Sequence, residues 1–167
     1  VDINTVGSVA VTVMSPSPGG GISSAFTAAI TVPAIGLSAV SGQGYNPTTA
    51  ALGHNTTLTA QVTGIGGSTA VTWTLSGAGS ISAAGVYTAP AALPGNPSVT
   101  VTATLITKAS ISASYALTLV NPVPVIYGMN PKVLQSATTI SAAISGVDFV
   151  PSSTVLVNGT AVSTIYQ

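Results

Sequence analysis

Charged residues are almost absent from this chain: its 167 residues include two Lys or Arg and two Asp or Glu. They are Lys108, Lys132, Asp2 and Asp148, and His54 is the single histidine. Nucleic acid is excluded as a partner, because neutralising phosphates requires clustered Lys or Arg. An enzyme is not expected either, since general acids, bases and activated nucleophiles depend on ionisable groups.

Cysteine is also absent, which excludes a disulfide framework and thiol chemistry. No apolar run approaches the about 18 residues that a membrane-spanning helix needs, so membrane insertion is not expected. The chain begins at Val1 without a Met or a basic and apolar leader, and we therefore expect a mature or internal fragment.

Apolar residues are abundant, at 46% of the chain, so the sequence can build a core and does not have the composition of a disordered chain. Its polar surface must come from Ser, Thr, Asn and Gln, and a net charge of zero favours association. Two explanations stay open. One is self-assembly or a harsh setting such as acid, and the other is compositional drift in a secreted protein.

Alternation of aliphatic residues with Thr or Ser recurs along the chain and predicts half-buried strands. The runs are 9–13, 57–62, 70–75, 99–105, 114–119 and 154–157. Gly- and Pro-rich turns separate them, and Asn158-Gly159 is typical of a tight hairpin turn with positive φ angles. No segment has a helical apolar stripe with caps. The pattern predicts an all-β fold of β-sandwiches with essentially no helix.

Two Pro-containing segments, around Pro33 and at 120–124, divide the chain into blocks of 1–34, 35–121 and 122–167. The middle block has the size of one sandwich, whereas each flank is too short to be one alone. The expected core of the middle block follows the inward positions of its strands: Leu58, Ala60, Val62, Val71, Trp73, Leu75, Val99, Val101, Ala103, Tyr115, Leu117 and Leu119.

The middle block resembles the Ig-like repeats of large bacterial surface proteins. The resemblance rests on 58–64, 70–75, 97–103 and, most specifically, on the stretch Gly79-Ser80-Ile81-Ser82-Ala83-Ala84-Gly85-Val86-Tyr87-Thr88-Ala89-Pro90. The last block resembles the start of a TIG/IPT domain, another Ig-like fold, through 124–126, 129–131, 144–151 and 153–159. The first block resembles the end of such a domain, through 7–13, 18–23 and Phe26. These resemblances imply Ig-like sandwiches in tandem and an extracellular or bacterial cell-surface location.

Candidate functional residues are few. His54 is interpreted as a solvated loop residue, and Asp2 and Asp148 fall in different blocks. No catalytic, cofactor-binding or metal-binding residue is predicted, because the sequence offers no carboxylate near Pro33 or Pro122. Trp73 is expected in the core, with a sugar-stacking platform as the alternative. Tyr45, Tyr87, Tyr115, Tyr127 and Tyr166 are scattered, and the glycosylation sequons at Asn55 and Asn158 are interpreted as chance.

These observations favour a structural repeat segment of a bacterial extracellular protein. We expect 1–32 of one copy to pair with 123–167 of the next, and two arrangements stay open. The copies are either windows of one continuous tandem-repeat polypeptide or separate subunits that join head to tail into a filament. The alternatives are an adhesin or carbohydrate-binding module with a glycan ligand, and a spacer within a secreted enzyme. The two flanks are expected to be parts of one domain type, because either alone would leave strand edges unpaired.

Overall fold

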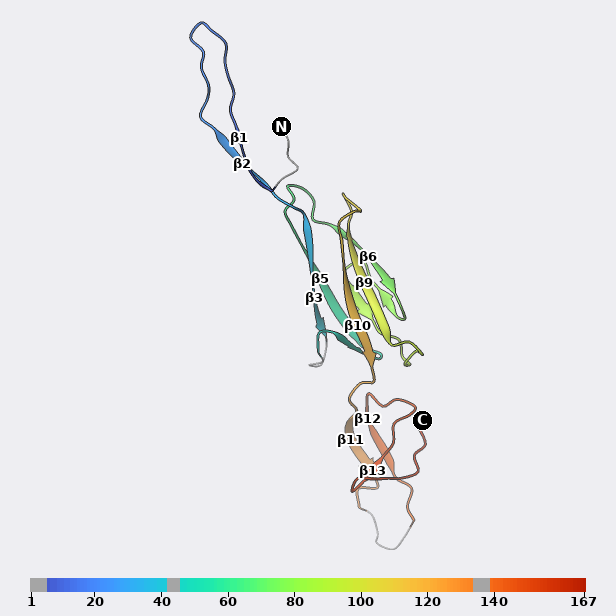
Figure 1. The fold of residues 1–167 in the computed structure, drawn as a ribbon. Coiled ribbons are helices and arrows are strands. Elements are labelled where there is room, and N and C mark those ends of the chain that lie inside the picture. Colours follow the sequence, from blue (N-terminus) through green and yellow to red (C-terminus); the bar gives the residue numbers. More distant parts are fainter. Residues whose placement is uncertain (1–5, 42–45, 134–138) are drawn as a thin grey trace.

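The computed structural model describes residues 6–41, 46–133 and 139–167, and these residues form strands, turns and loops without a helix. The all-β fold class predicted from the alternation is therefore confirmed. Three parts follow one another along an elongated molecule (Figure 1): an N-terminal hairpin, a central sandwich and a C-terminal block.

The central part is a sandwich of two four-stranded sheets, β3-β5-β8-β7 and β4-β10-β9-β6. All their residues lie between Ala34 and Val120. The strands are β3 (Ala34–Ser41), β4 (Thr49–Ala51), β5 (Asn55–Thr63), β6 (Val71–Ser76), β7 (Ser80–Ile81), β8 (Val86–Thr88), β9 (Ser98–Leu105) and β10 (Ser112–Val120). β4 joins the second sheet as an edge strand parallel to β10, whereas the other neighbouring strands in both sheets are antiparallel.

The Thr-aliphatic alternation explains why these segments form a sandwich. In β9, Val99, Val101 and Ala103 are buried, while Thr102 on the other face meets Ser114 of β10 with an Oγ–Oγ distance of 2.8 Å. Hydroxyl groups of this kind make the outer face of the sheet polar without adding charge. The aliphatic side chains on the inner face pack against the opposite sheet.

The core is only partly the predicted one. Of the twelve expected residues, those that are buried are Leu58, Val99, Val101, Ala103, Leu117 and Leu119. The others are half-buried: Ala60, Val62, Val71, Trp73, Leu75 and Tyr115. The buried residues that the prediction missed include Ala50, Leu52, Tyr87, Ala89 and Leu105. Most of these lie in short strands or turns, where no alternation is long enough to mark an inward face.

Tyr87 lies at the centre of this core with no exposed surface, and its hydroxyl donates a 2.6 Å hydrogen bond to the Ala78 carbonyl. A Cβ at Gly79, where φ is +102°, would come within 2.6 Å of the Tyr87 hydroxyl oxygen and of the Thr88 carbonyl oxygen. The Gly-x-Ile-Ser-x-x-Gly-x-Tyr stretch thus seats one large aromatic ring in the core and keeps its polar atom bonded.

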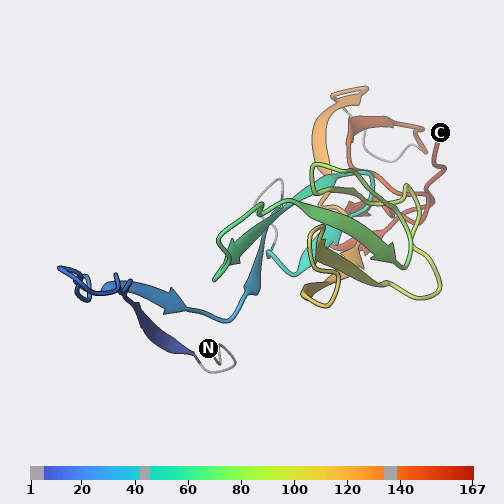
Figure 2. The same cartoon turned by 90° about the horizontal axis from the view of Figure 1, so that it is seen from above.

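The N-terminal hairpin projects beyond one end of the sandwich (Figures 1 and 2). It consists of β1 (Gly7–Val11) and β2 (Phe26–Ile30), paired antiparallel with Gly7 opposite Ile30. At its base, Thr31 Oγ1 donates a 2.9 Å hydrogen bond to the Gly64 carbonyl. Gly64 has φ +73°, and a Cβ there would lie 2.2 Å from the Val32 carbonyl oxygen, so the chain can pass this closely only beside a glycine.

The C-terminal block contains two separate two-stranded sheets rather than a sandwich. Its strands are β11 (Val125–Asn130), β12 (Ala143–Val147), β13 (Leu156–Val157) and β14 (Thr160–Ala161). The turn between β13 and β14 confirms the hairpin predicted at Asn158-Gly159, because both residues have positive φ, 51° and 80°. Of the predicted strand 154–157, only Leu156 and Val157 pair.

Replacing Tyr87 by Phe should lower the free energy of unfolding by about 1 kcal/mol, because the Ala78 carbonyl loses its buried donor. Tyr127→Phe, at a side chain that is 70% exposed, is the matched control and should cost nothing measurable in a urea titration. Equal losses in the two variants would contradict the assignment of Tyr87 to the core.

Burial also raises the pKa of the Tyr87 phenol above its usual value of 10.0. The unfolded chain therefore releases this proton at lower pH than the folded chain. The stability linked to Tyr87 is complete below about pH 10 and is lost as the pH rises further. Urea titrations between pH 9 and 11 should show a steeper alkaline loss for the native chain than for Tyr87→Phe.

Candidate functional site

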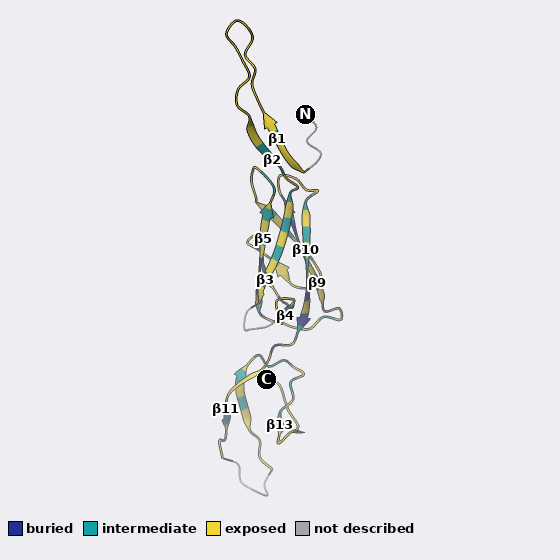
Figure 3. Ribbon diagram, turned by 60° about the vertical axis from the view of Figure 1, so that its left-hand side comes forward, coloured by how far each residue is buried: buried dark blue, intermediate teal, exposed yellow. Residues whose placement is uncertain are grey.

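Exposed apolar side chains gather at the two ends of the molecule. Among the described residues, all but three of the large hydrophobic side chains that are exposed lie in 6–32 or 123–166; the three are Val40, Leu93 and Ile106. Phe26 in the hairpin is 74% exposed and Ile165 near the C-terminus is 83% exposed. Figure 3 shows the same contrast: the buried segments lie in the sandwich and just beyond β10, whereas the N-terminal hairpin is mostly exposed. Exposed apolar side chains that are concentrated in particular segments are typical of interaction surfaces.

The ends also carry open strand edges. β1 and β2 pair only with each other among the described residues, and so do β11 with β12 and β13 with β14. A two-stranded sheet is at best marginally stable on its own, because one apolar face and both edges remain in water. The hairpin and the C-terminal block are therefore the parts of the chain that gain most from a partner.

The junction between the sandwich and the C-terminal block contains a hydrogen-bonded pair of side chains, His54 and Asp148. His54, between β4 and β5, places Nε2 2.8 Å from Asp148 Oδ1, with side-chain exposures of 25% and 13%. The interpretation of His54 as a solvated loop residue is wrong: it lies in a loop, but it is paired and partly buried. Asp148 directly follows β12 and has φ +63°. The other oxygen of its carboxylate is buried with no hydrogen-bond partner in the described structure.

Beside this pair lies a largely apolar hollow of about 280 Å³. Leu52 and Leu93 line it from the sandwich, Val150 and Pro151 from the C-terminal block, and Asn121 from the connection between them. The expectation that no carboxylate lies near this junction is also wrong, because Asp148 is two residues from Val150. The junction therefore combines apolar contact with one hydrogen-bonded His–Asp pair.

Metal binding has no support in this geometry. The part of the chain that the structure describes contains no group of three or more His, Cys, Asp or Glu side chains that could hold an ion. Asp2 lies outside the described residues and cannot be placed. His54 and Asp148 thus act as a contact between two blocks.

None of the residues that the structure describes belongs to a helix of the length and hydropathy that a membrane span requires.

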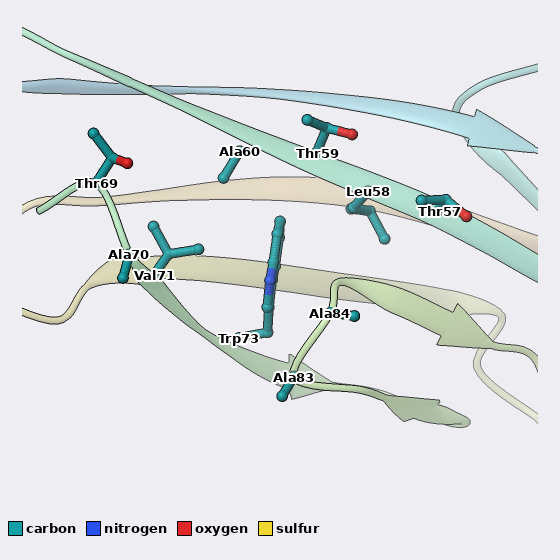
Figure 4. A pocket seen from close by; sticks show the side chains of 10 residues that line it. All are labelled: Thr57, Leu58, Thr59, Ala60, Thr69, Ala70, Val71, Trp73, Ala83 and Ala84. Carbon is teal, nitrogen blue, oxygen red and sulfur yellow. The ribbon is translucent and has the colours of Figure 1, made fainter.

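A second hollow, of about 400 Å³, opens on the flank of the sandwich between β5 and β6 (Figure 4). Trp73 extends from β6 toward β5 inside it, with Ala60 and Leu58 on the facing strand. The ring also rests on Gly85, where a Cβ would meet the indole carbons at 3.0 Å. Trp73 packs against the core as expected, yet it is half-buried rather than enclosed.

The remaining aromatic residues belong to different elements. Tyr115 of β10 is half-buried, Tyr127 of β11 is exposed, and Tyr166 follows β14; Tyr45 lies outside the described residues. Asn55 begins β5 and Asn158 forms the hairpin turn described above.

No protein-family model matches this chain, and no curated protein is similar to it at a significant level. The resemblance to bacterial Ig-like and TIG/IPT domains therefore rests on the residues quoted above.

Asp148→Asn should free the C-terminal block from the sandwich, because the substitution keeps the side-chain shape and removes its charge. In ¹⁵N relaxation measurements, the rotational correlation times of the two parts should diverge. The unfolding free energy of the sandwich should change by less than about 0.5 kcal/mol. Lys108→Gln, in the β9–β10 turn, is the control for losing a charge. Unchanged correlation times in Asp148→Asn would contradict a restraining role.

Proposed function

We propose that this chain is a non-enzymatic structural segment that assembles end to end through its two apolar ends. The observation that carries the proposal is the distribution of burial: the middle sandwich encloses its own core, while both ends keep large apolar side chains in water. A monomer with such ends is poorly soluble, whereas a chain of copies buries them.

In the proposed contact, the region 1–32 of one copy pairs with 123–167 of the next. Open edges of β1 or β2 supply main-chain hydrogen bonds to strands of the C-terminal block, and the exposed Val, Ile and Phe side chains pack between them. The two surfaces lie on different parts of the chain, so the contact is heterologous. Such a contact propagates into a fibre unless the rotation between copies closes a ring.

The near-absence of charge supports the same proposal. The two proposed contact regions contain three charged residues, Asp2, Lys132 and Asp148, and Asp148 is bonded to His54. Electrostatic repulsion between copies is therefore small, and the contact should depend little on salt. We place the protein outside the bacterial cell, as a repeat or spacer of a surface structure, on the resemblance of its sequence to Ig-like surface repeats.

Val13→Lys should weaken self-association roughly tenfold or more, because a charge would have to be buried in the contact without a partner. Val40→Lys is the matched control: Val40 is 71% exposed and Val13 68%, but Val40 lies on the middle sandwich. Sedimentation equilibrium of the native chain and of both variants measures the association constants.

The proposal fails if the native chain stays monomeric at the highest soluble concentration, or if both lysine variants weaken association equally. The urea midpoint of the sandwich should be the same in all three proteins, which separates a loss of assembly from a loss of folding.

A further inference from the structure

The sheet β3-β5-β8-β7 is complete along only part of its length. β5 pairs with β3 over eight residues, from Thr56 to Thr63, but with β8 over three, Asn55 to Thr57. One further hydrogen bond, from the Leu58 amide to the Gly85 carbonyl at 2.8 Å, closes that side of β5. Beyond Leu58, nothing in the described chain continues the row that β8 begins.

The unpaired groups on this edge can be identified from strand geometry. Leu58 directs its N–H toward β8, and backbone groups that point to the same side of a strand recur at every second residue. Ala60 and Val62 therefore present their N–H and C=O groups to the open side, whereas Thr59 and Gln61 face β3. Neither Ala60 nor Val62 has a partner on the open side among the described residues.

The hollow beside Trp73 lies along this same edge. Its lining comes from β5, from the start of β6 and from the Ala83-Ala84 turn, as Figure 4 shows. Four expected core residues that are only half-buried, Ala60, Val62, Val71 and Trp73, lie on these two strands. The indole N–H of Trp73 has no acceptor among the described residues. The sandwich is thus unfinished where β8 stops: it lacks both a strand and the side chains that this strand would bury.

We propose that this flank, Leu58–Val62 with Trp73, is a binding site for an extended, uncharged strand of another polypeptide. The added strand would continue the row of β8, bond to the main-chain groups of Ala60 and Val62, and bury alternate side chains against Trp73. The ten residues that line the hollow are uncharged, so a charged inward side chain would be desolvated without a partner. The limited volume favours small inward residues such as Ala and Val.

A peptide strand accounts for the site better than a sugar does. A sugar would need an open aromatic face, whereas the Trp73 ring stands between the two sheets and rests on Gly85. The main-chain groups of Ala60 and Val62 recur at the spacing of a strand, which only another backbone matches. This site is on the side of the sandwich, so it is separate from the proposed end-to-end contact and does not depend on it.

The test uses the full chain and a blocked heptapeptide, Val-Thr-Val-Thr-Ala-Thr-Leu, which copies residues 99–105 and is not part of the proposed end-to-end contact. Amide hydrogen exchange is followed by NMR. When about nine-tenths of the protein is bound, exchange at Ala60 and Val62 should slow about tenfold, because it proceeds only from the unbound tenth. Thr59 and Gln61, already bonded to β3, are internal controls and should not change.

Two control ligands sharpen the result. The first is the same peptide N-methylated at alternate residues, which cannot donate main-chain hydrogen bonds along one edge. The second has Lys at its central position and therefore carries a charge. Both should bind at least about tenfold more weakly. Unchanged exchange at Ala60 and Val62 in millimolar peptide would overturn the proposal, and so would protection confined to 123–167. It would also be overturned if a β-1,4-linked glucose hexamer shifted the Trp73 indole resonance and the peptide did not.

Discussion

The structure depends on the burial of apolar side chains, because charged side chains are too few to stabilise it. With two basic and two acidic side chains in the sequence, ion pairs cannot hold the fold or choose its partners. The sandwich achieves this burial by enclosing Tyr87, Leu105, Leu117, Val99 and Val101 between two sheets whose outer faces carry hydroxyls. The ends do not achieve it, because a two-stranded sheet cannot cover its own apolar face. The proposed assembly would bury that surface.

A polar contact lies where two described parts of the chain meet, at the junction of the sandwich and the C-terminal block. His54 and Asp148 are 94 residues apart in sequence and join the sandwich to the C-terminal block at 2.8 Å. A specific pair of polar side chains fixes the relative orientation of the sandwich and the C-terminal block, which apolar contact alone does not specify. In the proposed assembly, the angle at this junction would set how successive copies follow one another, so the pair would influence the shape of the assembled chain.

Sequence patterns predicted the strands because Thr-aliphatic alternation carries the period of a strand, and Asn158-Gly159 predicted its turn because few other residue pairs accept two positive φ angles. They did not predict the burial of Ala50, Leu52 and Tyr87, whose segments are too short to show a period. The partial exposure of Trp73 was also unpredictable. The alternation places Trp73 on the inward face correctly, but β8 is too short to cover it. The His54–Asp148 pair depends on how two blocks meet, which no local pattern encodes.

The central claim is that the two ends of different copies complete each other. A photoactivatable benzophenone side chain in place of Val11 tests it most directly, because cross-links then form only with what lies beside the hairpin. Unlabelled chain carrying this group is mixed with ¹⁵N-labelled native chain, irradiated, and analysed by mass spectrometry. The account predicts cross-links to residues 123–167 of the labelled copy. Cross-links only within the same copy, or to residues 35–121 of the labelled one, would contradict it.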